Sequence, residues 1–170
     1  ISYAMAHNRH AETVETLLKL LPAETGRWDD LLFQALAGTP AAQTVETLLR
    51  HGANPGALNA AKDTPLLTAL RNPRPSKPIV QILLEAGADP NAVAEDGYTP
   101  LLLAARQAPD PEIIALLMAH KASLKYRAPA SVERQGQKID LGSLTALSLA
   151  VVFNPNPRVA EALLTAGSQV

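Results

Sequence analysis

The chain has 170 residues, and its 15 Lys and Arg against 16 Asp and Glu give a formal net charge of −1 at pH 7. This balance argues against a dedicated nucleic-acid or anionic-membrane binder, so we expect no nucleic-acid partner. Cysteine is absent, which excludes disulfides, thiolate metal sites and cysteine nucleophiles. Hydrophobic residues make up 47% of the chain but aromatic residues only 4%, which favours a core of close-packed Ala- and Leu-rich helices. No apolar run approaches the roughly 18 residues of a membrane span, so we expect no membrane insertion.

A leucine doublet recurs along the chain and indicates internal repetition. It stands at Leu17-Leu18, Leu48-Leu49, Leu83-Leu84, Leu116-Leu117 and Leu163-Leu164. The steps between the doublets are 31, 35, 33 and 47 residues, so the last step is one period with an insertion. A second marker, Thr-Pro-Leu, begins at Thr64 and again 35 residues later at Thr99, with a degenerate copy at Thr145.

Each period predicts two short helices. Threonine before proline can cap a helix, because its side chain accepts a backbone N–H bond and proline tolerates the first helical position. A first helix is therefore expected at 101–107, and a second after the turn at 108–111, with Ile113, Leu116 and Leu117 on its apolar face. Gly87 supplies the left-handed residue that ends such a second helix. Helix pairs this short bury their apolar faces only by stacking on one another.

The repeated text is similar to the ankyrin repeat. Residues 95–105 read EDGYTPLLLAA and residues 83–91 read LLEAGADPN, in the order and spacing of that family's pattern. The family's histidine after Thr-Pro-Leu is missing, since Leu67, Leu102 and Ser148 stand there. The resemblance implies an all-α solenoid of about five stacked helix-turn-helix units joined by hairpin or loop fingers.

The chain is expected to form a single domain of five units. The boundaries are 1–25, 26–58, 59–93, 94–127 and 138–170, with an insertion at about 126–138 in the finger before the last unit. Residues 121–140 carry five basic and two acidic side chains. This basic insertion either selects an acidic or phosphorylated partner segment or is a solvated loop.

Nothing in the sequence points to catalysis, a cofactor or a metal. His7 and His10 have metal-ligand spacing but no third ligand nearby, and His51 and His120 fall at helix ends, where histidine suits the helix dipole. No nucleophile motif and no glycine-rich phosphate loop appears. We therefore expect a non-enzymatic protein without cofactor or metal.

The resemblance implies that the chain binds another protein on the concave face of inner helices and fingers. The candidate contact residues are Trp28, Asp63, Arg71, Glu95, Asp96, Tyr98, Arg106, Gln107, Tyr126, Arg127, Leu141 and Leu144. Trp28 is expected just before the first helix of its unit, either exposed or folded back over a short finger. Tyr98 is expected at the surface, where Tyr, Trp and Arg are enriched in binding hot spots.

Two other roles fit the same pattern. The repeats could inhibit or regulate one enzyme or toxin, as an effector or immunity protein does, or they could be a structural segment that packs against other domains of a longer chain. The compartment is left open: we expect a soluble protein, with the cytoplasm favoured and the periplasm or secretion as alternatives.

Overall fold

The computed structural model describes residues 27–38, 40–134 and 137–167. The unit expected at 1–25, with His7 and His10, lies outside these residues. The helices are α3 (Arg27–Leu36), α4 (Ala42–Arg50), α5 (Pro65–Arg71), α6 (Lys77–Glu85), α7 (Pro100–Gln107), α8 (Glu112–Ala119), α9 (Ala146–Phe153) and α10 (Pro157–Gly167). The strands β1 (Ala128–Arg134) and β2 (Gln137–Leu144) stand between α8 and α9.

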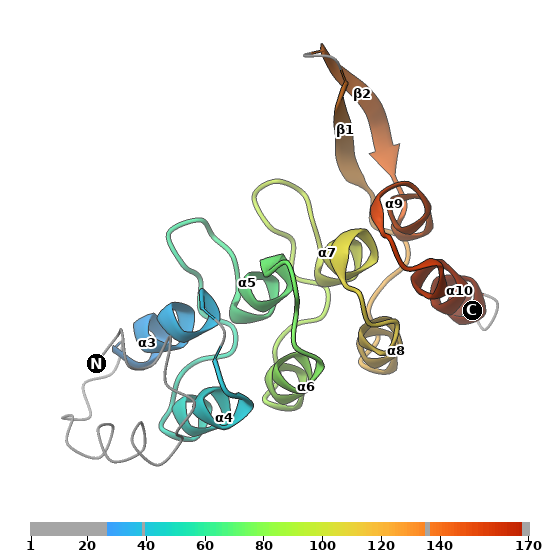
Figure 1. Ribbon diagram of the computed structural model, residues 1–170. Helices are drawn as coiled ribbons and strands as arrows, with labels where there is room; N and C mark the ends of the chain where they lie inside the picture. The colour runs from blue at the N-terminus through green and yellow to red at the C-terminus, as the bar shows by residue number, and fades with distance from the viewer. Residues whose placement is uncertain (1–26, 39, 135–136, 168–170) are drawn as a thin grey trace.

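The helices form two parallel rows (Figure 1). Helices α3, α5, α7 and α9 pack on one another in chain order, and α4, α6, α8 and α10 form the second row in the same way. Each pair places its apolar residues between the rows and against the next pair, so one continuous core runs the length of the described stack. The predicted all-α solenoid is confirmed.

Threonine caps begin the first-row helices, as predicted. The hydroxyl oxygens of Thr64, Thr99 and Thr145 accept the backbone N–H of the third following residue at 3.3, 3.4 and 3.2 Å. Pro65 and Pro100 occupy the first helical position, where no N–H partner is needed. The local chemistry read from Thr-Pro-Leu therefore fixes where these helices start.

The ends of the second-row helices show which residues of the fourth unit correspond to the leucine doublets of the other units, and the match differs from the predicted one. Gly87 has a φ of +92°, as expected for the residue that ends α6, and the N–H of Ala88 bonds to the carbonyl of Leu83. In the next unit Lys121 takes this left-handed conformation, with a φ of +67°, and the N–H of Ala122 bonds to the carbonyl of Leu117. Leu117 and Met118 are thus the counterparts of Leu83 and Leu84. The predicted doublet at 116–117 is one residue too early.

Side-chain amides tie each unit to the one before it. Asn72 donates to the carbonyl of Gly38, Gln107 to that of Leu70, and Asn154 to those of Ala105 and Ala108. All three amides stand at the C-terminal end of a first-row helix. The stack is therefore held by polar contacts between neighbouring units as well as by its core.

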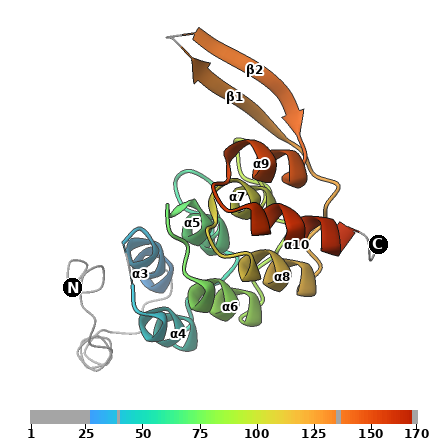
Figure 2. The same ribbon diagram turned by 45° about the vertical axis from the view of Figure 1, so that its right-hand side comes forward.

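The insertion forms an antiparallel β-hairpin. Ala128 pairs with Leu144 and Arg134 with Gln137, with one irregularity between Pro129 and Ser131. The hairpin points away from the helices in both views (Figures 1 and 2). The finger expected to be lengthened is a two-stranded arm that extends to Leu144, so β2 includes the first residues assigned to the fifth unit.

Candidate interaction face

The finger face is the side of the stack formed by α5, α7 and α9 and by the finger turns 58–63 and 93–98. Each turn is closed by a backbone bond, from Asn59 N–H to the carbonyl of Asp63 and from Ala94 N–H to that of Tyr98. The β1–β2 hairpin takes the same place before α9, and it projects on the same side as the turns (Figure 1).

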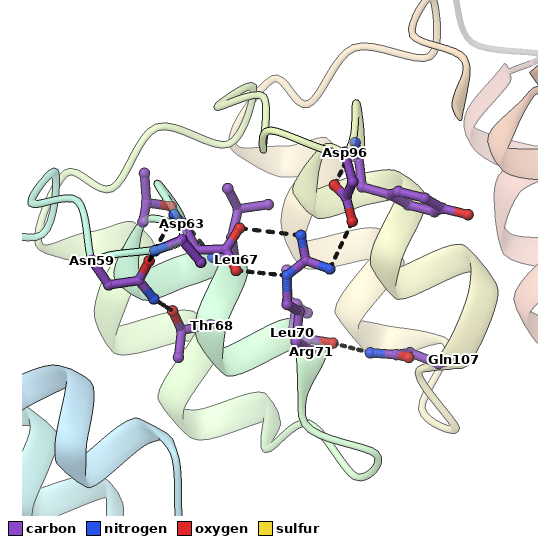
Figure 3. A network of polar contacts seen from close by, with 11 residues as sticks. Asn59, Asp63, Leu67, Thr68, Leu70, Arg71, Asp96 and Gln107 are labelled. Atoms are coloured by element: carbon purple, nitrogen blue, oxygen red, sulfur yellow. Dashed lines mark hydrogen bonds and ion pairs between the residues drawn. The ribbon is translucent and has the colours of Figure 1, made fainter. Parts of the chain in front are cut away.

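Arg71 joins two units on this face (Figure 3). Its Nε and Nη2 donate to the two carboxylate oxygens of Asp63 at 2.7 and 3.1 Å, and its Nη1 lies 3.0 Å from Oδ2 of Asp96 in the next finger. The Asp63 side chain is 7% exposed, so its charge depends on this bidentate partner. Arg71 is occupied by two carboxylates of its own chain.

The pKa directions in this network follow from the contacts. The hydrogen bond to Asp96 raises the pKa of Arg71, burial opposes this, and Asp63 adds to the rise. Burial acts to raise the pKa of Asp96, but hydrogen bonds from Arg71 and from the Tyr98 N–H, together with the charge of Arg71, hold it below its ordinary value. Arg71 and Asp96 are therefore both charged at neutral pH, and their ion pair links the third unit to the fourth.

Arg106 has different surroundings from Arg71. Its Nη1 donates to the Tyr98 hydroxyl at 3.1 Å, and its guanidinium carbon lies 5.6 Å from the centroid of the Tyr98 ring and 5.3 Å from that of Phe153. Arg106 itself is exposed. Two aromatic rings thus hold a cationic group at the surface of α7.

Two aromatic residues among the candidate contacts, Trp28 and Tyr98, are buried. Trp28 lies inside α3 with 7% of its surface exposed, and its ring stacks on His51 at a centroid distance of 5.2 Å. Tyr98 is 6% exposed because α7 and Arg106 cover it. The expected exposure of Tyr98 is wrong, whereas Trp28 follows the alternative in which it packs inward.

The remaining candidates divide between exposed and structural positions. Glu95 is exposed and pairs with Lys62 at 3.2 Å, whereas Gln107 is half-buried and bonded to the Leu70 carbonyl. Tyr126 and Arg127 are exposed at the base of the hairpin. Leu144 is half-buried where β2 meets α9, and the side chain of Leu141 lies outside the described residues.

Three further residues lie on this face that the sequence did not mark as candidate contacts: Lys62, Val152 and Phe153. Lys62 pairs with Glu95, Phe153 lies against Arg106, and Val152 is 54% exposed. A positional signal for Val152 was present, because Arg71, Arg106 and Val152 are each the seventh residue after a capping threonine.

The charge of the described stack changes from one end to the other. A hollow of about 510 Å³ between α3 and the first finger is lined by Asp29, Asp30 and Leu58 among others. Asp29 Oδ1 accepts the backbone N–H of Asn54 at 2.6 Å, while Asp30 is exposed. At the other end, exposed Lys121, Lys125 and Arg127 precede β1. The stack therefore offers an acidic end and a basic end.

The histidines of the described chain occupy the predicted helix ends. His51 and His120 are the C-caps of α4 and α8, and Nδ1 of His120 lies 2.9 Å from the Leu116 carbonyl. Within 27–38, 40–134 and 137–167, no three His, Asp or Glu side chains gather as metal ligands would. Across the same residues, every helix is too short or too polar to cross a bilayer.

The paired helices, capping threonines and projecting fingers define a repeat solenoid, a class that presents an extended surface to partners. A family model described as ankyrin repeats (3 copies) matches residues 31–128 and 76–170. The chain belongs to the ankyrin repeat family. A comparison with curated proteins gave no significant match. Ankyrin repeats generally act as protein–protein interaction modules and are typically not enzymes.

Proposed function

We propose that this chain is a protein-binding module whose partner lies across the finger face at the fourth and fifth units. The observation that carries the proposal is that Arg106 in the last turn of α7 and Tyr126 and Arg127 just before β1 are exposed. The hairpin that follows projects on the same side of the stack as the finger turns (Figure 1). The ion pair between Arg71 and Asp96 links the third unit to the fourth on this face. The partner contacts we assign are to Glu95, Asp96, Arg106 and the base of the hairpin.

The basic end of the stack favours an acidic partner segment. Lys121, Lys125 and Arg127 are exposed, and among the described side chains none forms an ion pair with them. Their field accelerates the approach of an acidic surface and makes binding sensitive to salt. An inhibitory or regulatory role is a specific form of this function, in which the bound partner loses its activity.

The test is affinity capture from a lysate of the source cells, with the bound proteins identified by mass spectrometry. Tyr126→Ala with Arg127→Ala removes two exposed contacts, and Arg50→Ala with Glu85→Ala is a matched pair on the second-row helices α4 and α6. We expect a partner that is lost with the first pair and kept with the second. Equal loss with both pairs, or no specific partner, would contradict the proposal.

A second candidate, packing against another folded domain, is favoured by the far side of the last helix pair. Val151 is 70% exposed although its counterpart Ala105 is fully buried, and Leu164 is 57% exposed although its counterpart Leu84 is 4% exposed. Two positions that bury apolar surface against a following unit are thus open here. Val151→Asp with Leu164→Asp would abolish a contact made by this surface, whereas Arg106→Ala would leave it intact.

A further inference from the structure

The third and fourth units carry an arginine at the same position but give it different partners. Arg71 and Arg106 are each the seventh residue after the capping threonine. Arg71 binds the residue before its own threonine, Asp63, and the residue three before the next threonine, Asp96. Both partners are carboxylates, and the first is bound in the bidentate way that suits a guanidinium.

Neither carboxylate has a counterpart at the corresponding sequence position of the next unit. The residue before its threonine is Tyr98, and the residue three before Thr145 is Gly142, which has no side chain. Among the residues that the structure describes, no carboxylate lies within ion-pair distance of Arg106. The same geometry therefore recurs one unit further along with its anionic partners replaced.

The rings of Tyr98 and Phe153 hold the Arg106 guanidinium without using all of its donors. A guanidinium has five N–H groups, and the described contacts of Arg106 use one, to the Tyr98 hydroxyl. The guanidinium carbon lies over both rings, 5.6 Å from the Tyr98 centroid and 5.3 Å from the Phe153 centroid, so the other N–H groups can meet a planar anion. Because the side chain is already held, a ligand costs little further ordering of this arginine.

We propose that Arg106 binds a carboxylate of the partner protein, from an Asp or Glu side chain, in the place that Asp63 and Asp96 take at Arg71. This inference rests on the proposed protein-binding function and names the partner's chemistry at that site. Val152, the counterpart of Arg106 in the next unit, is 54% exposed and contacts an apolar partner residue. Neighbouring helices lie about 10 Å apart and an extended chain advances about 3.3 Å per residue, so the acidic and apolar residues are about three positions apart.

The experiment uses two pools of end-capped ten-residue peptides with otherwise random neutral positions. One pool carries Asp three residues before Leu, and the other carries Asn in place of Asp. The immobilised full chain is exposed to both pools at equal concentration and low salt, and the retained peptides are quantified by mass spectrometry. Arg106→Gln is the test variant, and Arg50→Gln is the matched control, since Arg50 is an exposed arginine on α4.

We expect the wild-type chain and Arg50→Gln to retain the Asp pool about tenfold over the Asn pool, and Arg106→Gln to retain both equally. The inference is overturned if the wild type does not discriminate, if Arg106→Gln keeps the preference, or if neither pool is retained. The thermal melt of each variant shows whether it is folded. Capture of a partner that depends on Tyr126 and Arg127 is measured separately, so the binding function can stand when the carboxylate assignment fails.

Discussion

At the scale of single residues, the Asp63–Arg71 ion pair of the finger face and the Glu46–Arg50 ion pair of α4 differ in burial. Asp63 is almost completely enclosed and receives two bonds from Arg71, whereas the Glu46–Arg50 pair on α4 is open to solvent, with the arginine 74% exposed. Exposed pairs contribute little because water and salt screen them, but removing the partner of a buried carboxylate leaves its charge uncompensated.

Arg71→Ala should therefore destabilise the protein by about 1–2 kcal/mol, a value reduced from that of a fully buried pair because Arg71 is itself partly exposed. Arg50→Ala, which removes the same charge, should cost less than about 0.5 kcal/mol. Urea denaturation followed by circular dichroism measures both. Equal losses in the two variants would show that Asp63 does not depend on Arg71.

Asp96 gives the same network a dependence on pH. Its pKa is lowered in the folded state, so its contribution to stability is present in full above its ordinary pKa of about 4 and is lost as the pH falls through the lowered value. At pH 7 we expect Asp96→Asn to lower the free energy of unfolding by at most about 1 kcal/mol, since the carboxylate is 47% exposed.

The difference between the wild type and Asp96→Asn should begin to shrink below about pH 4, the ordinary pKa of the carboxyl, and approach zero as the pH falls through the lowered pKa of folded Asp96. Thermal melts of both proteins from pH 3 to pH 7 measure it. Glu161→Gln, an exposed carboxylate on α10, controls for the loss of one surface charge. A difference that stays constant across this range would contradict the assigned role of Asp96.

At the scale of helices, the capping threonines set where α5, α7 and α9 begin. Thr99 is 1% exposed and its hydroxyl accepts the N–H of Leu102, so no water can replace this bond easily. Ser76 stands at the corresponding end of α6 but makes no side-chain cap bond. The two positions allow a direct comparison between a capping side chain that accepts a backbone N–H bond and one that does not.

Thr99→Val keeps the shape of the side chain and removes the hydroxyl, so it should lower stability by about 1 kcal/mol. Ser76→Ala should change stability by much less, because no cap bond is lost. Both effects are read from the midpoint of urea unfolding. A loss at Ser76 as large as that at Thr99 would mean that burial or propensity, and not capping, accounts for the threonine.

Helix starts could be predicted from sequence because their cause is local: Thr64, Thr99 and Thr145 act on residues three positions away. The register of the fourth unit could not, since Leu116, Leu117 and Met118 form one apolar run and the marking glycine is replaced by Lys121. Only the backbone bonds of Lys121 and Ala122 decide which pair matches the other doublets.

The site was harder to predict than the fold because its contacts join different units. Arg71 and Asp96 are visible in the sequence as opposite charges, but their meeting depends on how one finger lies over the preceding helix. The burial of Trp28 depends on packing between two helices of its own unit, since α4 brings His51 against its ring. As aromatic residues, Trp28 and Tyr98 were candidates for exposed contact positions. Packing between neighbouring elements buries both side chains in the structure.

At the scale of the whole molecule, each unit contacts mainly its neighbours, so stability should be close to a sum of unit and interface contributions. The amides at the ends of the first-row helices are suitable probes of single interfaces. Asn154 serves the junction of the fourth and fifth units through two carbonyls, and Asn72 serves the junction of the second and third through one.

Asn154→Ala should leave the carbonyls of Ala105 and Ala108 without this donor and speed amide hydrogen exchange in α9 and α10 by about tenfold, with α5 and α6 unchanged. Asn72→Ala should show the opposite pattern, with faster amide exchange in α3 and α4 and no change in α9 and α10. Hydrogen–deuterium exchange with mass spectrometry resolves the two ends of the stack. Uniform acceleration by either variant would mean that the stack opens as one cooperative unit, because a weakened junction would then be felt equally by helices that do not touch it.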